Sequence, residues 1–268
     1  MCLGVVAAVF CASQPHAQDL TAAQRAEMLA ADIVLLGEQH DNPDHHLGQA
    51  RLMTEIEPAA VVFEMLTHQM AAIVRAFEGD DLGKLGEAIG WEAAGWPSFE
   101  IYRPVFAALD SAFVVGAAAP RETVRAAFSE GAAAVFGSDA ARYGLTRPLP
   151  EAEYQTRETL QFDAHCQAMP LEMMGGMIEA QRLRDAQFAQ AALEALAEHG
   201  GPVVVITGNG HARTDWGVPF VIAQAASEVK VFSVGFGEHS GGNSDGRFDG
   251  FVLTAPIERG DPCAAFGN

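Results

Sequence analysis

The sequence predicts an α/β protein with a mainly parallel β-sheet, flanked by helices and carrying a helical insertion subdomain. Short apolar runs alternate along the chain with segments of helical periodicity, which is typical of βαβ units. Each run is continuously apolar, as expected for strands buried on both faces. The 268 residues are 49% hydrophobic and 19% charged, a composition that excludes a disordered chain and suits one large domain.

The first predicted strand is Asp32–Gly37, a short apolar run that ends in glycine. A helix should follow it, because Asn42 is a favoured N-cap and Pro43 fits the first helical position. This helix is expected to end before Pro58, since the residue preceding a proline disfavours helical geometry.

The later strands follow the same pattern. A second helix should begin near His68. The gap between residues 117 and 202 is too long for a simple crossover and contains helical patterns at Glu151–Cys166 and Leu171–His199, so residues of about 130–178 are predicted to form the helical insertion. Gly235–Gly246 is predicted to be a loop. The remaining predicted strands are Ala60–Glu64, Ala112–Ala117, Pro202–Gly208, Val229–Gly235 and an edge strand at Asp249–Thr254.

Residues 1–18 are predicted to be an export signal, and the mature domain to span residues 19–268. The segment has no Lys, Arg, Asp or Glu, and its apolar block Leu3–Ala12 is followed by small and polar residues. A buried N-terminal helix is the alternative. Cys11 follows Phe10, where a lipoprotein signal has a small residue, so the sequence does not predict a lipid anchor.

The four cysteines are Cys2, Cys11, Cys166 and Cys263. The first two would leave with the signal, so Cys166 and Cys263 would be the only pair in an oxidising compartment, where disulfides persist. An even count permits a bridge and does not require one. Two separate buried thiols are the alternative.

The charge balance excludes two classes of partner. Asp and Glu number 35 against 16 Lys and Arg, for a formal net charge of −19. Nucleic acid binding requires a positive surface, and so does electrostatic docking on anionic lipid. Neither function is expected.

Four polar side chains follow predicted parallel strands. Glu38 and His40 come after the first strand, Glu64 ends the second, and His211 follows the fourth. Ligands of open parallel sheets bind beyond the carboxyl ends of the strands, so these side chains should share one cleft. Two carboxylates and two imidazoles are suited to a divalent metal, or to a general base with an orienting partner.

Each of these residues alone has a simpler interpretation, as a helix N-terminal acid or a hydrogen-bonded core histidine. Convergence of the four favours a shared site. His45 and His46 lie in the predicted first helix; one of them could face the same site, but we expect them on the helix surface or in a local cap. The sequence has no Walker or His-Glu-x-x-His motif, and no Gly-x-Ser-x-Gly elbow that joins a predicted strand to a helix.

A second group lies on the predicted helices near the insertion. His165 is followed by Met173, Met174 and Met177, a methionine-rich run suited either to core packing or to an apolar wall for a flat ligand such as haem. Periodicity alone favours core packing. Gln181, Arg184 and Asp185 are polar residues on the same helix, at spacings that place Gln181 on one face with Arg184 or Asp185, and they could support the strand-end site.

The combined motifs resemble the ChaN family of haem-binding uptake proteins. The matching blocks cover roughly residues 30–266 and are VLLGEQHDNPDHH (34–46), VVFEM (61–65), FDAHCQ (162–167), QRLRDA (181–186), VVVITGNGHARTDWGVP (203–219) and DPC (261–263). The resemblance extends to a superfamily that includes erythromycin esterases and Tiki-type metalloproteases. It implies an α/β sheet with a helical insertion and a site formed by Glu38, His40, Glu64 and His211.

The resemblance further implies haem binding and haem or iron acquisition in the periplasm or at the outer membrane. Homodimers and an outer-membrane receptor or other envelope partner are further expectations. No matched motif names the haem ligand, and Tyr154 and His165 are chosen as candidates because they lie on the predicted insertion. The alternative function is a hydrolase, either metal-dependent or built on the Glu and His residues. A relict site in an interaction module is the third hypothesis.

Overall fold

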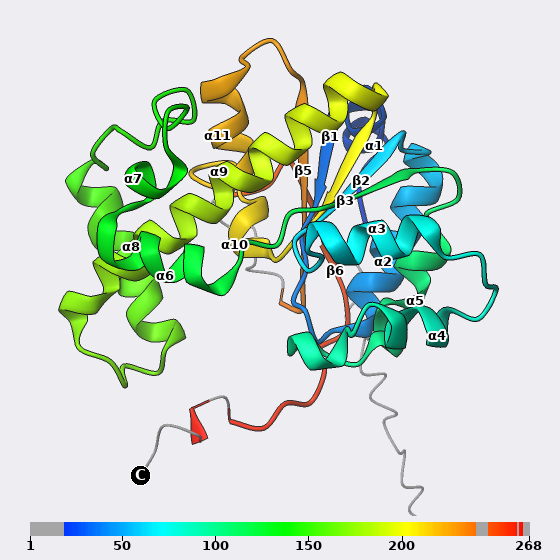
Figure 1. Cartoon of the computed structure of the whole chain (residues 1–268), viewed down its shortest axis with the longest axis horizontal. Coiled ribbons are helices and arrows are strands. Elements are labelled where there is room, and N and C mark those ends of the chain that lie inside the picture. The colour runs from blue at the N-terminus through cyan, green and yellow to red at the C-terminus, as the bar shows by residue number, and fades with distance from the viewer. Residues whose placement is uncertain (1–18, 240–245, 262, 265–268) are drawn as a thin grey trace, which may run out of the picture.

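The computed structural model describes residues 19–239, 246–261, 263 and 264, which form a parallel β-sheet with helices on both faces (Figure 1). The predicted α/β class is confirmed, and every strand pairing in this part of the chain is parallel. The predicted signal at residues 1–18 lies outside the described residues. So do residues 240–245 of the predicted glycine-rich loop.

The six strands of this sheet lie in the order β3-β2-β4-β1-β5-β6. Strand β4 therefore separates β1 from β2, so the first, second and fourth strands of the chain are neighbours in the centre of the sheet. The strands are β1 (Ile33–Leu36), β2 (Ala60–Phe63), β3 (Phe113–Gly116), β4 (Val203–Ile206), β5 (Val231–Gly237) and β6 (Gly250–Leu253). All six predicted strands are present, and β5 continues to Gly237, into the stretch predicted to be a loop.

Alternate residues of each central strand enter different hydrophobic cores, because successive strand side chains point to opposite faces. In β1, Val34 and Leu36 belong to one core, whereas Ile33 and Leu35 belong to the other. This explains why the strands are continuous apolar runs. The helices packed on the first face are α1 (Ala22–Leu29), α2 (Pro43–Ile56), α3 (His68–Ala76), α4 (Leu82–Ala88) and α5 (Phe99–Ala107), with the 3₁₀ turn η1 (Glu92–Ala94) between the last two.

Helix α2 begins and ends as its sequence predicts. The side chain of Asn42 accepts a hydrogen bond from the backbone N–H of Asp44, and Pro43 occupies the first helical position. Glu57 adopts a left-handed conformation, with φ of 50°, just before Pro58. This capping fixes the first turn of α2 directly beyond β1, close to the carboxyl edge of the sheet.

The opposite face is covered mainly by α9, a helix of 26 residues. The helices between β3 and α9 lie to one side of the sheet (Figure 1); the boundaries of an insertion at about 130–178 stay a prediction. These elements are α6 (Arg121–Glu130), α7 (Ala132–Phe136), α8 (Glu151–Ala164) and η2 (Leu171–Met173), followed after α9 (Met174–His199) by α10 (Asn209–Ala212) and α11 (Val218–Ala225).

A disulfide joins Cys166, just after α8, to Cys263, with the two Cα atoms 5.4 Å apart. The predicted proximity of these two cysteines is confirmed. The bridge ties the C-terminal segment that follows β6 to the helices beside the sheet. No helix in the described part of the chain is both long and apolar enough to cross a membrane.

Candidate functional site

The carboxyl ends of β1, β2 and β4 bring together Glu38, His40, Glu64 and His211, the strand-end site. The Nε2 atoms of His40 and His211 lie 4.0 and 3.9 Å from the same oxygen, Oε1 of Glu64. Because β4 lies between β1 and β2, residues far apart in sequence become neighbours. The predicted convergence of these four side chains is confirmed, and their functional roles stay a proposal.

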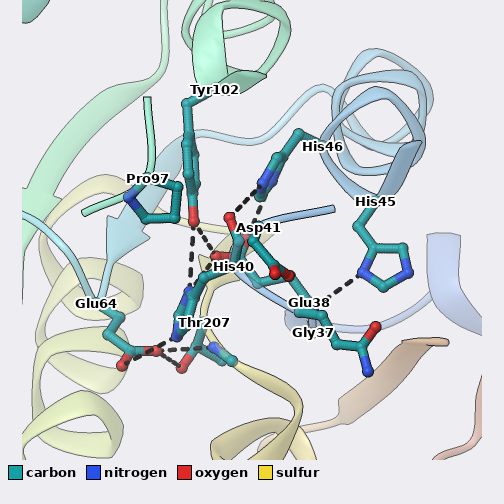
Figure 2. A network of polar contacts seen from close by, with 12 residues as sticks. Gly37, Glu38, His40, Asp41, His45, His46, Glu64, Pro97, Tyr102 and Thr207 are labelled. Carbon is teal, nitrogen blue, oxygen red and sulfur yellow. Dashed lines mark hydrogen bonds and ion pairs between the residues drawn. The ribbon is translucent and has the colours of Figure 1, made fainter. Parts of the chain in front are cut away.

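Glu38 is the centre of a buried hydrogen-bond network (Figure 2). One of its oxygens, Oε1, accepts a hydrogen bond of 2.5 Å from the hydroxyl of Tyr102 and lies 2.6 Å from Nδ1 of His40. The other, Oε2, accepts from the amide of Gln49 at 2.8 Å and lies 3.4 Å from Nδ1 of His46. Glu38 is therefore held in place by groups from α2 and α5, and in turn fixes the ring of His40.

The expectation that His45 and His46 lie on the helix surface is wrong, because both are fully buried. His45 does act as a local cap, since its Nδ1 accepts a hydrogen bond from the backbone N–H of Gln39. The ring of His46 packs against the ring of Tyr102 in a tilted arrangement, with centroids 3.8 Å apart. The side of α2 that carries His46 is enclosed by α5, so this imidazole is turned toward Glu38, whereas Asp44 in the same turn is exposed.

Glu64 is held by backbone and side-chain donors from two other elements. Its Oε2 accepts hydrogen bonds from the hydroxyl of Thr207 at 2.6 Å and the backbone N–H of Gly208 at 2.7 Å. Its Oε1 pairs with the guanidinium of Arg184 on α9. The predicted supporting role of Arg184 thus corresponds to a direct ion pair.

His211 is oriented by Asp185, another of the predicted supporting residues. Nδ1 of His211 lies 2.6 Å from Oδ1 of Asp185, and the edge of Phe188 packs against the imidazole ring. Gln181 donates to the carbonyl of Gly210 at 3.3 Å, in the short helix α10 that carries His211. Helix α9 therefore supplies three polar contacts to the site, from residues spaced along a single turn.

Electrostatics favour a charged network around Glu38. Burial would raise the pKa of Glu38, but hydrogen bonds and positive charge from His40 and His46 outweigh burial and hold it far below the usual range. Burial would likewise lower the pKa values of His40 and His46, yet the hydrogen bonds and charge of Glu38 raise both. For His45 burial prevails and lowers the pKa to about 4, so this ring is neutral near pH 7.

The pKa values of the two other buried carboxylates of the site, Glu64 and Asp185, shift in opposite directions. Burial would raise the pKa of Glu64, but the charges of His211, Arg184 and His40 lower it to about 2. For Asp185 burial prevails and raises the pKa, against the opposing charge of His211. Glu64 is thus a fixed anion facing two imidazoles, one oriented by Glu38 and the other by Asp185.

The predicted divalent metal at this site is not supported. Across the residues that the structure describes, no three His, Cys, Asp or Glu side chains are arranged to hold a metal ion. The oxygens of Glu38 are taken up by Tyr102 and Gln49, and Arg184 supplies a positive charge at Glu64. The chemistry open to this geometry is general acid–base transfer through the Nε2 atoms of the two histidines.

A cavity of about 810 Å³, the large cavity, opens beside the strand-end site and includes Glu64 and Arg184 in its wall. The ring of Trp96, also in this wall, lies 5.1 Å from the ring of His40, which links the cavity to the site. The wall is mainly apolar: its other members are Met65, Met70, Ala93, Ala94, Ala118, Ala119, Pro120, Val124, Phe128, Met177 and Ala180, with Thr67, Arg121 and Arg125 as polar residues.

The residues predicted to bind haem do not all reach this cavity. Met177 lines it, whereas Met174 is fully buried and Met173 is 38% exposed, outside the cavity wall. Tyr154 and His165 belong to α8 and the residue just after it, and neither lines the cavity. Nδ1 of His165 lies 2.7 Å from the carbonyl oxygen of Gln161, within its own helix end.

Sequence reasoning missed Tyr102, Gln49 and Trp96. Tyr102 lies on α5, 64 residues after Glu38 in the chain, and comes from the Trp- and Gly-rich stretch between β2 and β3. Gln49 lies four residues after His45, so its place on the inner face of α2 follows from helical spacing once His45 is known to be buried. That spacing was the signal available for Gln49, and no comparable signal marked Tyr102.

Comparison with known families decides what kind of protein this is. A family profile described as haem-binding uptake, Tiki superfamily, ChaN matches residues 25–222. The chain belongs to the ChaN family. This confirms the resemblance drawn from the sequence motifs. Among curated proteins, none matches the chain.

A solved structure of another ChaN protein has the same fold as this chain. A ChaN of Campylobacter jejuni, described with cofacial haem binding, has a TM-score of 0.64 at 20% identity, over 86% of this chain and 90% of that one. The erythromycin esterase EreC, as an H289N mutant, matches with a TM-score of 0.48 at 12% identity, over 85% of this chain and 77% of its own. The type III effector HopBA1 matches with a TM-score of 0.47 at 12% identity, over 88% of this chain and 92% of its own. At these identities the likeness to the Campylobacter protein concerns the fold alone.

Proposed function

We propose that this protein binds haem in the cell envelope and takes part in haem or iron acquisition. Membership of a family of haem-binding uptake proteins supports the haem assignment. The apolar, uncharged segment at residues 1–18 supports export, to the periplasm or to the outer membrane. A homodimer, and an outer-membrane receptor or other envelope partner, remain predictions that follow from the same proposal.

The observation that carries the proposal is the chemistry of the large cavity. Haem is a flat apolar macrocycle with two anionic propionates, so its site needs an apolar wall and nearby cations. The wall has both, with Phe128 and Met177 among its apolar side chains and Arg121, Arg125 and Arg184 around it. Three arginines at one cavity are notable in a chain with a net charge of −19.

The arginines can be assigned separate tasks. Arg184 is committed to Glu64, whereas Arg121 and Arg125 lie one turn apart on α6, are exposed, and form no ion pair with any described residue. We assign the propionates to Arg121 and Arg125, because guanidinium groups recognise carboxylates well. When bound, the haem would supply an iron that accepts a protein ligand. Tyr154 and His165 were the candidates from the sequence, but neither lines this cavity, so neither is assigned as the ligand of a haem bound here.

Titration of the purified protein with hemin, followed by the Soret band, tests the proposal. Met177→Glu should abolish the hemin-induced shift, because it places a carboxylate in the apolar wall. Met173→Glu, four residues earlier on an exposed side chain, is the matched control and should bind as wild type does. Hemin binding unaffected by Met177→Glu, in a protein that remains folded, would place the haem elsewhere.

The propionate assignment predicts a smaller effect. Exposed ion pairs contribute about 0.2–1 kcal/mol each, so the double variant Arg121→Gln/Arg125→Gln should bind hemin about 2- to 30-fold more weakly. Arg103→Gln, an exposed arginine on α5 paired with Glu100, is the control. Tyr154→Phe and His165→Ala should leave the wavelength of the bound spectrum unchanged if the haem lies in this cavity, because neither side chain lines it. A wavelength shift in either variant would place the haem beside that residue instead.

A His- and Glu-based hydrolase is the second candidate, favoured by one specific observation. Two imidazoles, each oriented through Nδ1 by a buried carboxylate, present Nε2 toward Glu64. Such pairs can activate water as a general base. Hydrolysis of 4-nitrophenyl acetate that His40→Ala and His211→Ala each abolish, without changing the hemin spectrum, would support it. Equal rates in all three proteins would eliminate it.

A further inference from the structure

A second cavity of about 360 Å³, the small cavity, lies on another side of α9. It is formed by α8, α9, α11 and the segment 143–150, and shares no lining residue with the large cavity. Aromatic and aliphatic side chains make up much of its wall, among them Tyr143, Leu149 and Phe220. Its volume lies at the lower end of the range of roughly 300–1,000 Å³ that is typical of small-molecule sites.

The wall of this cavity is fixed by hydrogen bonds. Arg182 on α9 donates from one guanidinium nitrogen to the carbonyl oxygens of Gly144, Leu145 and Arg147, at 3.0–3.4 Å. Arg147 in turn donates to the side chain of Gln224 on α11 at 2.8 Å. The irregular segment is therefore held against two helices, and the cavity is formed before any ligand binds.

Two buried polar side chains of the wall have atoms without a partner. Arg157 is 5% exposed, and its Nε and NH1 atoms form no hydrogen bond with the described residues. Asp185 is 1% exposed, and its Oδ2 is likewise without a partner, although Oδ1 contacts His211. Leaving such groups unsatisfied costs about 1–3 kcal/mol each, so a missing partner is expected.

Arg157 can bind an anionic acceptor, and Asp185 can bind a hydrogen-bond donor. Arg157 pairs with Glu153 through Nη2 and lies over the ring of Trp216, 4.9 Å from its centroid, which leaves the N–H groups of Nε and Nη1, on different sides of the guanidinium, as donors for a ligand. Asp185 offers an oxygen for a hydrogen-bond donor. Burial lowers the pKa of Arg157, against the opposing charges of Glu153 and Asp185. Arg157 and Asp185 therefore lie close enough to act on one ligand together.

We propose that the small cavity binds a small carboxylic acid that carries a hydroxyl or ammonium group on the carbon next to the carboxylate, and an apolar side chain. The carboxylate is recognised by Arg157, the neighbouring donor by Asp185, and the apolar part by Tyr143 and Phe220. Because Asp185 also orients His211, this ligand would contact the strand-end site through one shared carboxylate. The inference does not depend on haem binding.

Isothermal titration calorimetry on the full-length mature protein with four matched probes tests this proposal. The probes are 2-hydroxy-3-phenylpropanoate, phenylalanine, 3-phenylpropanoate, which lacks the donor, and 2-hydroxy-3-phenylpropanamide, which lacks the carboxylate. We expect one or both of the first two to bind with a dissociation constant of about 1 mM or tighter. The last two should bind at least about tenfold more weakly. The comparison between the first two tells a hydroxy acid from an amino acid.

Variants separate recognition from folding. Arg157→Gln should remove the preference for the acid over its amide, and Asp185→Asn should change the preference for the hydroxyl. Leu149→Trp fills the cavity without touching a charged group, so it should abolish binding even if the two polar variants fail to fold. Arg103→Gln is the control. Equal binding of acid and amide, unchanged binding by Leu149→Trp, or no heat with any probe, as for a cavity that holds water alone, would each overturn the proposal.

Discussion

Replacing Glu38 by glutamine should destabilise the protein severely, because this carboxylate holds the strand-end site together. Tyr102, His40 and Gln49 contact its two oxygens at 2.5–2.8 Å. Glutamine keeps one accepting oxygen and replaces the other with a donor, which must face at least one of these donors. Hydrogen bonds to charged groups contribute about 1.5–3 kcal/mol each, and breaking a buried charge pair costs about 3–5 kcal/mol. We expect Glu38→Gln to lower the free energy of unfolding by about 3–5 kcal/mol.

The same network predicts the pH at which the loss is greatest. Because the pKa of Glu38 is lowered in the folded state, its stabilising contribution is present above the unfolded value of about 4.3 and is lost as pH falls toward the folded pKa. The pKa values of His40 and His46 are raised, so their contributions are present below about 6.5 and are lost as pH rises through the folded values. The network therefore stabilises most between about pH 4.5 and 6.5.

Urea unfolding of wild type and Glu38→Gln from pH 4 to 9, followed by circular dichroism, measures both effects. The difference between the two proteins should be largest near pH 5–6 and should shrink as pH rises above the histidine pKa values. Glu100→Gln is the control, because Glu100 forms an exposed pair with Arg103. A loss below about 1 kcal/mol at pH 6, or a difference that does not vary with pH, would refute the reasoning.

Two further predictions concern the same fold. Gly208→Ala places a Cβ 3.1 Å from Nε2 of His40 and 3.8 Å from Oε2 of Glu64, so the imidazole ring must move. We expect a changed NMR signal of His40 in a folded protein. An unchanged signal would contradict the close approach of Gly208 to His40. Protein lacking residues 1–18 should show no free thiol when denatured without reductant and two after reduction, because Cys166 and Cys263 are bridged; free thiols before reduction would contradict the bridge.

The strands and their polar ends were predictable because each signal is local. The continuous apolar runs indicate strands buried on both faces. In a parallel sheet the carboxyl ends of the strands share one edge, so the sequence predicted that Glu38, Glu64 and His211 lie close together. Asn42 and Pro43 likewise predicted where α2 begins. These features depend on a few neighbouring residues and on general sheet geometry.

The strand order and the residues that reach the site from distant helices depend on tertiary packing, which no local sequence pattern predicts. The place of β4 between β1 and β2 decides that His40 and His211 face the same oxygen of Glu64, yet the order of parallel strands is not set by their sequences. Tyr102 reaches Glu38 from α5, 64 residues away in the chain, and Asp185 and Arg184 both reach the site although they are adjacent on α9. His46 was misjudged because α5 covers a face of α2 that would otherwise be exposed.

Helix α9 contributes side chains to the large cavity, the strand-end site and the small cavity. These three sets of contacts restrict insertions and deletions within the helix. Met177 and Arg184 face the large cavity, Asp185 contacts His211, and Arg182 holds the wall of the small cavity. An α-helix turns by about 100° per residue, so inserting or deleting one residue between Met177 and Asp185 would rotate one set of side chains away from its partners. Homologous sequences should therefore vary in composition along this segment but keep its length, and gaps in their alignment should fall outside it.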